Sequence, residues 1–395
     1  MTKIWYFCCM SALSLLFPAH VFAADFFPTK FVSTSGTSFV VGDQTFIPVG
    51  VNHHDETTLW NPSKTIPGFS EVTRNDFRTF ASLGFTSIRL SVKADYFHSP
   101  KGFQWLDQRV KWAKQNGIRI LLDMHIPSGG AQQDYQPSEM NLKFWNSPSL
   151  QDDFVQVWGS VAKHYASTPT IWGYGLMNEP ASRNIGQVKE LYRRLDVAIR
   201  ASDSRHIILI SPVQTYDEQS NEHFVFPDIV DSKLAYDVHF YQPYGFTVQN
   251  VPWGILDSRI IGRYPSEATS STSAWNADRI RMSLDDAGLR AAREKGVPAV
   301  IGEFGAVFHG TVRGQYSWIQ DVISAAKQAG VGWEYWVYQT NNLNGGFGLT
   351  DGKGSTRKAT LGLLAESAKD RSAEVRGLTL TSKNVKKLAG LLMRR

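Results

Sequence analysis

The chain has only two cysteines among its 395 residues, and they are adjacent, at positions 8 and 9. Both fall in an N-terminal stretch in which Lys3 supplies a positive charge and an apolar run from 4 to 17 leads to the small-residue pattern Val21-Phe22-Ala23. This order is typical of a signal peptide that is removed after export. From residue 24 onward there is no cysteine, which excludes disulfide bonds, thiol catalysis and cysteine metal sites there.

Long hydrophobic runs are also missing. The apolar run near the N-terminus is shorter than the ~20 residues that a membrane-spanning helix needs. We therefore predict a signal peptide over residues 1–23 and a secreted or periplasmic protein.

The body of the chain has no excess of positive charge. The formal net charge is +5, but residues 371–395 contain seven basic residues and one acid. With this tail and Lys3 set aside, the remainder carries a net charge of −2, which argues against a nucleic-acid partner.

Within the tail, Val385, Leu388, Leu391 and Leu392 recur at helical spacing among basic residues. This pattern predicts either weak contact with an anionic membrane or cell-wall surface, or a solvated chain end.

From residue 46 to 368, short β-rich apolar runs alternate with amphipathic stretches eight times, and the predicted domain, residues 24–370, contains no internal repeat or tethering linker. This predicts one (β/α)8 TIM barrel. A short β-hairpin at 31–45 is expected to cover its N-terminal end. The expected strands are Phe46 to Val51, Thr86 to Val92, Ile118 to Met124, Ile171 to Met177, His206 to Ile210, Leu234 to His239, Ala299 to Gly302 and Val331 to Trp336. The expected helices include Phe103 to Asn116, Leu150 to Tyr165, Val188 to Ala201, Arg279 to Lys295 and Tyr316 to Gln328.

The carboxyl ends of these strands carry an unusual set of side chains. In a TIM barrel the strand ends converge on one opening, so the residues there are candidates for chemistry. They are Arg89, Asp123, His125, Asn178, Glu179, His239, Tyr241, Glu303 and Trp336. A polar residue at one strand end is commonplace, but two carboxylates facing each other across the opening are what glycoside hydrolysis requires. One protonates the leaving oxygen and the other stabilises the positive charge that grows at the sugar carbon.

The sequence resembles glycoside hydrolase family 5, of the TIM-barrel glycosidase clan. The resemblance lies in SIRLSV, LLDMH, LMNEP, VHFYQP, IGEFG and WEYWVY, which follow one another in the family's order over nearly the whole barrel. It implies that Glu179 is the general acid/base and Glu303 the nucleophile of a retaining mechanism, without a cofactor. It also implies that Arg89, His125, Asn178, His239, Tyr241 and Trp336 bind substrate or orient the two acids.

A metal site is not expected. His53, His54, Asp55 and Glu56 are consecutive, so their side chains alternate between opposite sides of an extended chain and cannot easily converge on one ion. A substrate hydrogen bond from one of the two histidines is the preferred interpretation.

The most probable substrate class under the resemblance is a polysaccharide or oligosaccharide, cut by an endo-β-1,4-glucanase of the cellulase type. A β-mannanase, a β-1,3-glucanase, a glycolipid-glycan hydrolase and a non-catalytic carbohydrate-binding barrel stay open, because loops such as 126–146 and 243–276 decide the sugar. Loop tryptophans could extend the sugar platform or simply pack under loops; these are Trp60, Trp145, Trp253 and Trp275. A monomer is expected.

Overall fold

The structure is a computed structural model, and it describes residues 28–130, 142–216, 222–248, 261–269, 273–308, 313–341 and 346–375. The predicted signal peptide, Trp253 and most of the basic tail lie outside these ranges. In the part that the structure describes, no helix is both long enough and apolar enough to cross a membrane.

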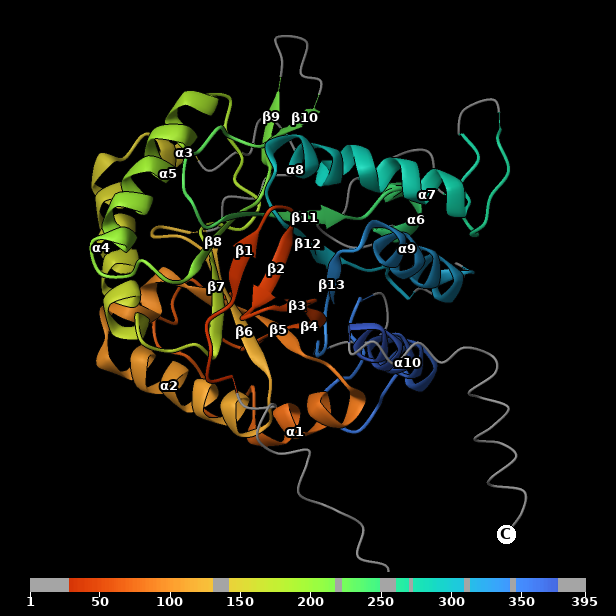
Figure 1. Cartoon of the computed structure of the whole chain (residues 1–395), viewed down its shortest axis with the longest axis horizontal. Coiled ribbons are helices and arrows are strands. Elements are labelled where there is room, and N and C mark those ends of the chain that lie inside the picture. Colours follow the sequence, from red (N-terminus) through yellow and green to blue (C-terminus); the bar gives the residue numbers. More distant parts are fainter. Residues whose placement is uncertain are drawn as a thin grey trace, which may run out of the picture.

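Eight parallel strands close into a barrel, as predicted (Figure 1). Going round the barrel, the order is β11-β12-β13-β4-β5-β6-β7-β8, and β8 pairs with β11 to complete the ring. Their side chains are buried almost throughout, as expected of parallel strands covered on both faces. The bounds are β4 (Val49–His54), β5 (Ser87–Lys93), β6 (Arg119–Ile126), β7 (Ile171–Gly175), β8 (Ile207–Ile210), β11 (Leu234–Phe240), β12 (Ala299–Phe304) and β13 (Gly332–Tyr335).

The first barrel strand begins later than the sequence predicted. Phe46 belongs to a preceding strand, and β4 starts at Val49. Pro48 separates the two because its nitrogen carries no hydrogen for a strand ladder, although its carbonyl accepts a bond from the Trp333 amide.

Helices cover the outside of the barrel (Figure 1). They are α1 (Arg74–Leu83), α2 (Pro100–Gln115), α3 (Leu142–Trp145), α4 (Pro148–Tyr165), α5 (Ile185–Arg200), α6 (Tyr244–Thr247), α7 (Ala277–Leu284), α8 (Arg290–Lys295), α9 (Gln315–Ala329) and α10 (Lys358–Val375), with a 3-10 turn η1 (Ala94–His98). The single helix predicted from Arg279 to Lys295 is wrong, because a π turn η2 (Asp285–Leu289) divides it. Gly288 has φ 157° there, and a Cβ atom at this position would lie 2.8 Å from the Phe226 ring.

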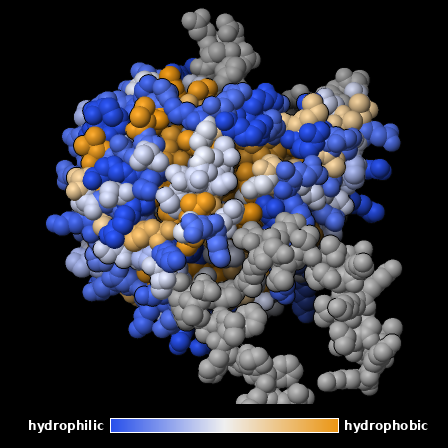
Figure 2. All heavy atoms as spheres, in the orientation of Figure 1, coloured by the Kyte–Doolittle hydropathy of each residue, from blue (hydrophilic) through white to orange (hydrophobic). Residues whose placement is uncertain are grey.

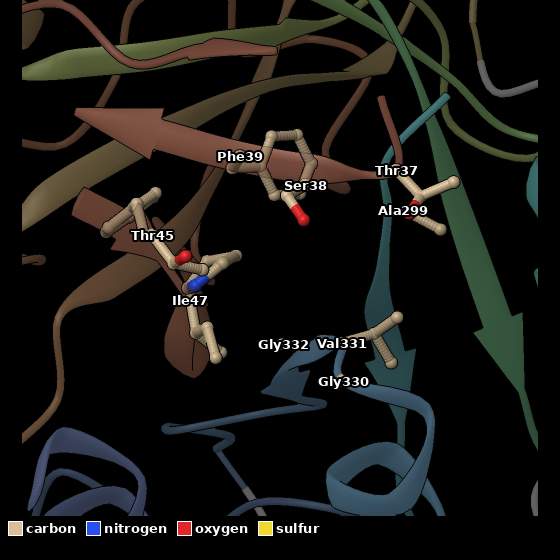
Figure 3. Close-up of a pocket in the computed structure, with 11 residues that line it drawn as sticks. Thr37, Ser38, Phe39, Thr45, Ile47, Ala299, Gly330, Val331 and Gly332 are labelled. Atoms are coloured by element: carbon tan, nitrogen blue, oxygen red, sulfur yellow. The ribbon is translucent and has the colours of Figure 1, made fainter. Parts of the chain in front are cut away.

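A small antiparallel sheet covers the amino ends of the barrel strands. It contains β1 (Ser33–Ser35), β2 (Ser38–Val41) and β3 (Gln44–Phe46), so the predicted hairpin is present and gains a third strand. Phe39 and Phe46 both pack edge-on against Trp172 of β7, with ring centroids 5.1 and 5.8 Å apart. A small pocket remains beside this sheet; Figure 3 shows its lining, which includes Thr37, Ser38, Phe39, Thr45, Ile47, Ala299, Gly330, Val331 and Gly332.

The barrel interior is apolar at that end and polar at the other. The lower layer, formed with the small sheet, contains Leu121, Trp172, Ile207, Leu209, Ala235 and Val300. Above it, towards the carboxyl ends of the strands, lie charged side chains that are fully or almost fully buried, among them Arg89, Asp123, Asp237 and Glu334. The outer surface has the opposite character, since hydrophilic side chains predominate at the periphery of the view in Figure 2. A buried polar layer in a barrel must be paired internally, which directs attention to the carboxyl end.

An additional antiparallel pair, β9 (Val213–Tyr216) and β10 (Glu222–Val225), follows β8. Arg371, which the sequence analysis assigned to the basic tail, is buried in α10 and donates to the Val331 carbonyl.

Candidate active site

Two glutamates face each other at the carboxyl end of the barrel. Glu303 lies in β12, and Glu179 lies in the turn that follows β7. A carboxylate oxygen of each and a ring nitrogen of His239 all lie within 4.8 Å of one another. Retaining glycosidases hold their carboxyl groups roughly 5–5.5 Å apart, whereas inverting enzymes leave about 6.5–9.5 Å for a water molecule. The spacing therefore suits a nucleophile and an acid acting on the same sugar carbon.

Arg89 is the centre of the polar layer. Its side chain is fully buried and forms ion pairs with Asp123 at 3.0 Å, Asp237 at 3.2 Å and Glu303 at 2.7 Å. It also donates to the side-chain oxygens of Asn52 and Asn178, at 3.1 and 2.8 Å. Although burial alone would lower the pKa of Arg89, these carboxylates raise it, so the guanidinium is a permanent cation.

Glu303 is held at both of its oxygens. Arg89 donates to Oε1, and the Tyr241 hydroxyl donates to Oε2 at 2.8 Å. Burial raises the pKa of Glu303 above its ordinary value, while the positive charges of His239 and Arg89 oppose that shift. The sequence predicted the contacts with Arg89 and Tyr241, but not that burial outweighs them. Two donors aimed at the carboxylate nevertheless fix its orientation and favour its charged form.

Glu179 occupies a strained and more open position. Its backbone φ is 36°, in the left-handed region that residues other than glycine seldom adopt. Its side chain is 27% exposed, compared with 4% for Glu303. His239 Nδ1 lies 2.7 Å from Glu179 Oε1, so a hydrogen bond joins the histidine to the acid. Burial would lower the pKa of His239, but the charges of Glu303 and Asp237 raise it well above the usual value.

Asn178 is oriented from two sides. Its Oδ1 accepts from Arg89, and its Nδ2 lies 3.3 Å from Nε2 of His125. His125 Nδ1 is 2.7 Å from Asp123 Oδ2, which assigns the ring hydrogen to Nδ1 and leaves Nε2 as the acceptor for Asn178. One amide hydrogen of Asn178 is not used in these contacts and can be donated to a sugar hydroxyl.

Trp336 forms an aromatic wall beside the two acids. His125 stacks on it with an interplanar angle of 12° and His54 with 27°, while Trp60 meets its edge. Trp60 is 42% exposed and donates to His54 Nε2 at 3.3 Å. The other two loop tryptophans within the described ranges are packing residues: Trp145 is 4% exposed and donates to the Ala181 carbonyl, and Trp275 is 8% exposed.

The side chains of residues 53–56 point in different directions, as the alternation of side chains along an extended chain predicted. His53 contacts Asp76 of α1, whereas His54 contacts Glu56 and the aromatic wall. Among the described residues, a group of ligand atoms within 4.8 Å of one another is formed by Glu179, His239 and Glu303, which are the two acids and the histidine that contacts them.

Three residues of the polar layer escaped the sequence analysis: Asn52, Asp237 and Glu334. Each lies two residues before a residue that the sequence analysis named: Asn52 before His54, Asp237 before His239 and Glu334 before Trp336. Side chains two apart in a strand share a face, so this period could have located them.

Comparison with known proteins agrees with this geometry. A family model described as cellulase (glycosyl hydrolase family 5) matches residues 44–342. The chain belongs to glycosyl hydrolase family 5. It is therefore a glycoside hydrolase of a retaining family, acting on β-glycosidic bonds.

Relatives of this family 5 hydrolase are distant in sequence. Endoglucanase C of Acetivibrio thermocellus is 24% identical over 298 residues, which cover 68% of this chain and 84% of that protein. Cellodextrinase A of Ruminococcus flavefaciens is 22% identical over 296 residues, covering 73% and 80% of the two chains.

Solved structures share the fold of the family 5 hydrolase. A β-glucanase from Saccharophagus degradans, solved in complex with cellotetraose, has a TM-score of 0.59 at 21% identity and covers 86% of this chain and 94% of its own. Endoglucanase Cel5A of Thermotoga maritima, in complex with mannotriose, has a TM-score of 0.61 at 18% identity and covers 80% and 97%.

Proposed function

We propose that this family 5 hydrolase is an endo-β-1,4-glucanase that cleaves the backbone of a glucan polysaccharide or its oligosaccharides. The observation that supports glycoside hydrolysis is the short distance between Glu179 and Glu303, whose carboxylate oxygens lie within 4.8 Å of each other. The glucan is supported by relatives named endoglucanase and cellodextrinase, and by a β-glucanase of the same fold that holds cellotetraose.

In the first step Glu303 attacks the anomeric carbon and Glu179 protonates the leaving oxygen. Arg89 and Tyr241 orient the attacking carboxylate through its two oxygens. His239 holds the proton beside Glu179, so it is available when the glycosidic bond breaks. The product of this step is a covalent glycosyl ester of Glu303, with the departed sugar carrying the proton of Glu179.

In the second step Glu179, now a carboxylate, removes a proton from a water molecule that attacks the anomeric carbon. The bond from this carbon to the Glu303 oxygen breaks, which releases Glu303 as a carboxylate and leaves Glu179 protonated again. The water can reach this position because Glu179 is the more exposed of the two acids. Asn178 donates its free amide hydrogen to the sugar 2-hydroxyl, a bond that strengthens as the ring becomes positive. Trp336 supplies an apolar face for the sugar ring in the same subsite.

A panel of polysaccharides tests this proposal. Release of reducing ends is measured on carboxymethylcellulose, barley β-glucan, laminarin, mannan, xylan and glycolipid glycans, and the anomer first formed is followed by NMR. A fast fall in viscosity of carboxymethylcellulose with few reducing ends is expected of endo action. Activity confined to mannan or laminarin would replace the glucan, whereas first appearance of the inverted anomer would contradict the mechanism.

A non-catalytic carbohydrate-binding barrel is the alternative of a different class. It would require cellulose binding by the unsubstituted protein without reducing ends from any β-glycan in the panel. The supported acids Glu179 and Glu303 argue against it, because a pure binding site has no need for an ionised carboxylate fixed at both oxygens.

We also propose that residues 1–23 direct export and that the basic tail after Val375 contacts anionic surfaces weakly. Expression of the full chain, followed by N-terminal sequencing of the exported protein, tests the first point. Binding to anionic vesicles or wall material before and after deletion of residues 376–395 tests the second, since equal binding would contradict it.

A further inference from the structure

Glu334 lies beneath the two acids, in the interior of the barrel. It belongs to β13 and has no exposed surface. Its Oε1 accepts a 2.6 Å hydrogen bond from the Ser87 hydroxyl. The Ser87 oxygen in turn accepts from Trp172 Nε1 at 2.9 Å, so the single hydroxyl hydrogen is committed to Glu334. Its Oε2 has no hydrogen-bond partner within the described residues.

The charges around Glu334 do not balance if every carboxylate is ionised. Arg89 pairs directly with Asp123, Asp237 and Glu303, and the ion pairs found in the described ranges do not include Glu334. Even with His239 and His125 both protonated, the five carboxylates Asp123, Asp237, Glu179, Glu303 and Glu334 would face only three cations. An uncompensated charge in a barrel interior is expensive, and such sites bind a proton instead.

Glu334 is the member of this cluster best placed to keep that proton. Within the part of the chain that the structure describes, Ser87 is the one donor to the Glu334 carboxyl group, and Glu334 lacks the direct cation contact that Asp123, Asp237 and Glu303 have. Burial raises the pKa of Glu334 to about 8, with the charges of Asp237 and Asp123 adding to the shift, while Ser87 and Arg89 oppose it. Asp237, on β11, which β12 separates from β13, also has one oxygen without a partner in the described structure.

We propose that Glu334 is a neutral carboxylic acid in the working enzyme and acts as a positioning residue that leaves the guanidinium of Arg89 to Glu303. A second link runs through the backbone. The Glu334 carbonyl accepts from Asn52 Nδ2 at 3.0 Å, and Asn52 Oδ1 accepts from Arg89 at 3.1 Å. Glu334 touches no substrate, so its effect on the reaction passes through Arg89 and Asn52.

Loss of the proton would place a fourth anion below Arg89. The guanidinium would then be drawn towards the barrel interior and away from Glu303, while the folded state would gain an unpaired buried charge. Both activity and stability should therefore decline as Glu334 ionises, and a glutamine, which cannot ionise, should remove this decline.

The test compares the unsubstituted protein with Glu334→Gln and with Glu294→Gln, a control at an exposed glutamate of α8. The ratio of kcat/KM at pH 9 to that at pH 6 should rise by at least about threefold in Glu334→Gln and stay unchanged in the control. The melting temperature should fall less between pH 6 and pH 9 in Glu334→Gln than in the other two proteins. Equal pH dependence in all three proteins would overturn the proposal.

Infrared spectroscopy can detect the protonated carboxyl group of Glu334 without a substitution at this residue. In a background that carries both Glu179→Gln and Glu303→Gln, which removes the two acids of the active site, a carboxylic C=O band should be present at pH 6 and disappear around pH 8, above the pKa of about 6 at Asp196. Absence of that band at pH 6 would overturn the proposal even where Glu334→Gln does not fold.

Discussion

The Nδ1 atom of His239 lies 2.7 Å from Oε1 of Glu179. This contact joins the more exposed of the two acids to a histidine that is itself buried among carboxylates. Because the pKa of His239 is raised, the imidazole carries its proton over a wide pH range. The acid that must give up a proton and later recover it therefore has a proton carrier in direct contact.

Replacing Glu303 by alanine should abolish the covalent step. We expect kcat on a β-glucan to fall by at least about 10³-fold, because the nucleophile acts as a unit with its donors. Azide should restore turnover of an aryl β-glucoside and give a product of inverted configuration, which NMR identifies. Azide rescue that yields only the retained anomer would assign the nucleophile elsewhere.

Replacing Glu179 by alanine should affect substrates according to their leaving group. A polysaccharide, whose leaving alcohol needs a proton, should lose about 10²–10⁴-fold in kcat/KM, since general acid catalysis contributes roughly that much. A dinitrophenyl glycoside needs no proton, so its first step should be nearly unaffected. Burst kinetics with both substrates measure the difference, and equal losses on the two would contradict the role of general acid.

Arg89→Met should destabilise the fold as well as the reaction. The substitution leaves Asp123, Asp237 and Glu303 buried without their shared cation, and breaking a buried ion pair costs about 3–5 kcal/mol. Urea unfolding measures the loss. Lys93→Met, at a buried lysine outside the acid cluster that donates to the Thr58 and Asn61 carbonyls, is the matched control and should leave the contacts of Glu303 intact.

Trp60→Ala should weaken binding of the sugar chain and leave the fold nearly unchanged. Trp60 is 42% exposed, forms T-shaped ring contacts with Trp336, His54 and His125, and donates one hydrogen bond to His54. We expect KM for long cello-oligosaccharides to rise severalfold with a small change in melting temperature. Trp145→Ala should lower the melting temperature and change KM little, because that side chain is buried and donates a hydrogen bond to the Ala181 carbonyl. Equal effects of the two on KM would contradict the assignment.

Asp203 should contribute to the acid stability of the barrel. It accepts bonds from the Tyr174 hydroxyl and from the amides of Arg205 and His206. Burial alone would raise the pKa of Asp203, but the bond and charge of His206 bring it down to about 2. Because its pKa is depressed, ionised Asp203 stabilises the folded state at pH values above the ordinary pKa of 3.8. This stabilisation is lost as the pH falls towards 2. Asp203→Asn should therefore show a smaller decrease in melting temperature between pH 4 and pH 2.

Much of the architecture followed from local patterns. Apolar runs such as Ile171 to Met177 predicted barrel strands. A parallel strand that is buried on both faces must be apolar at successive positions, not only at every second one. The same logic placed Glu179 and Glu303 at one opening, since parallel strands end on one side of a barrel. The break at Gly288 was not visible in this way, because the π turn depends on the close approach of Phe226.

The sequence by itself determined the barrel and its carboxyl-end residues, since strand period and strand order are local properties of the chain. Its resemblance to glycoside hydrolase family 5 implied the retaining mechanism. Only the tertiary structure decided how the charges balance. Arg89 meets Asp237 and Glu303 from strands that are 148 and 214 residues away in the chain. The strand period could have placed Glu334 on the same face as Trp336, but it gives no information about the charges that surround this glutamate. Its neutral state depends on desolvation and on the carboxylates of other strands, which exist only once the barrel has closed.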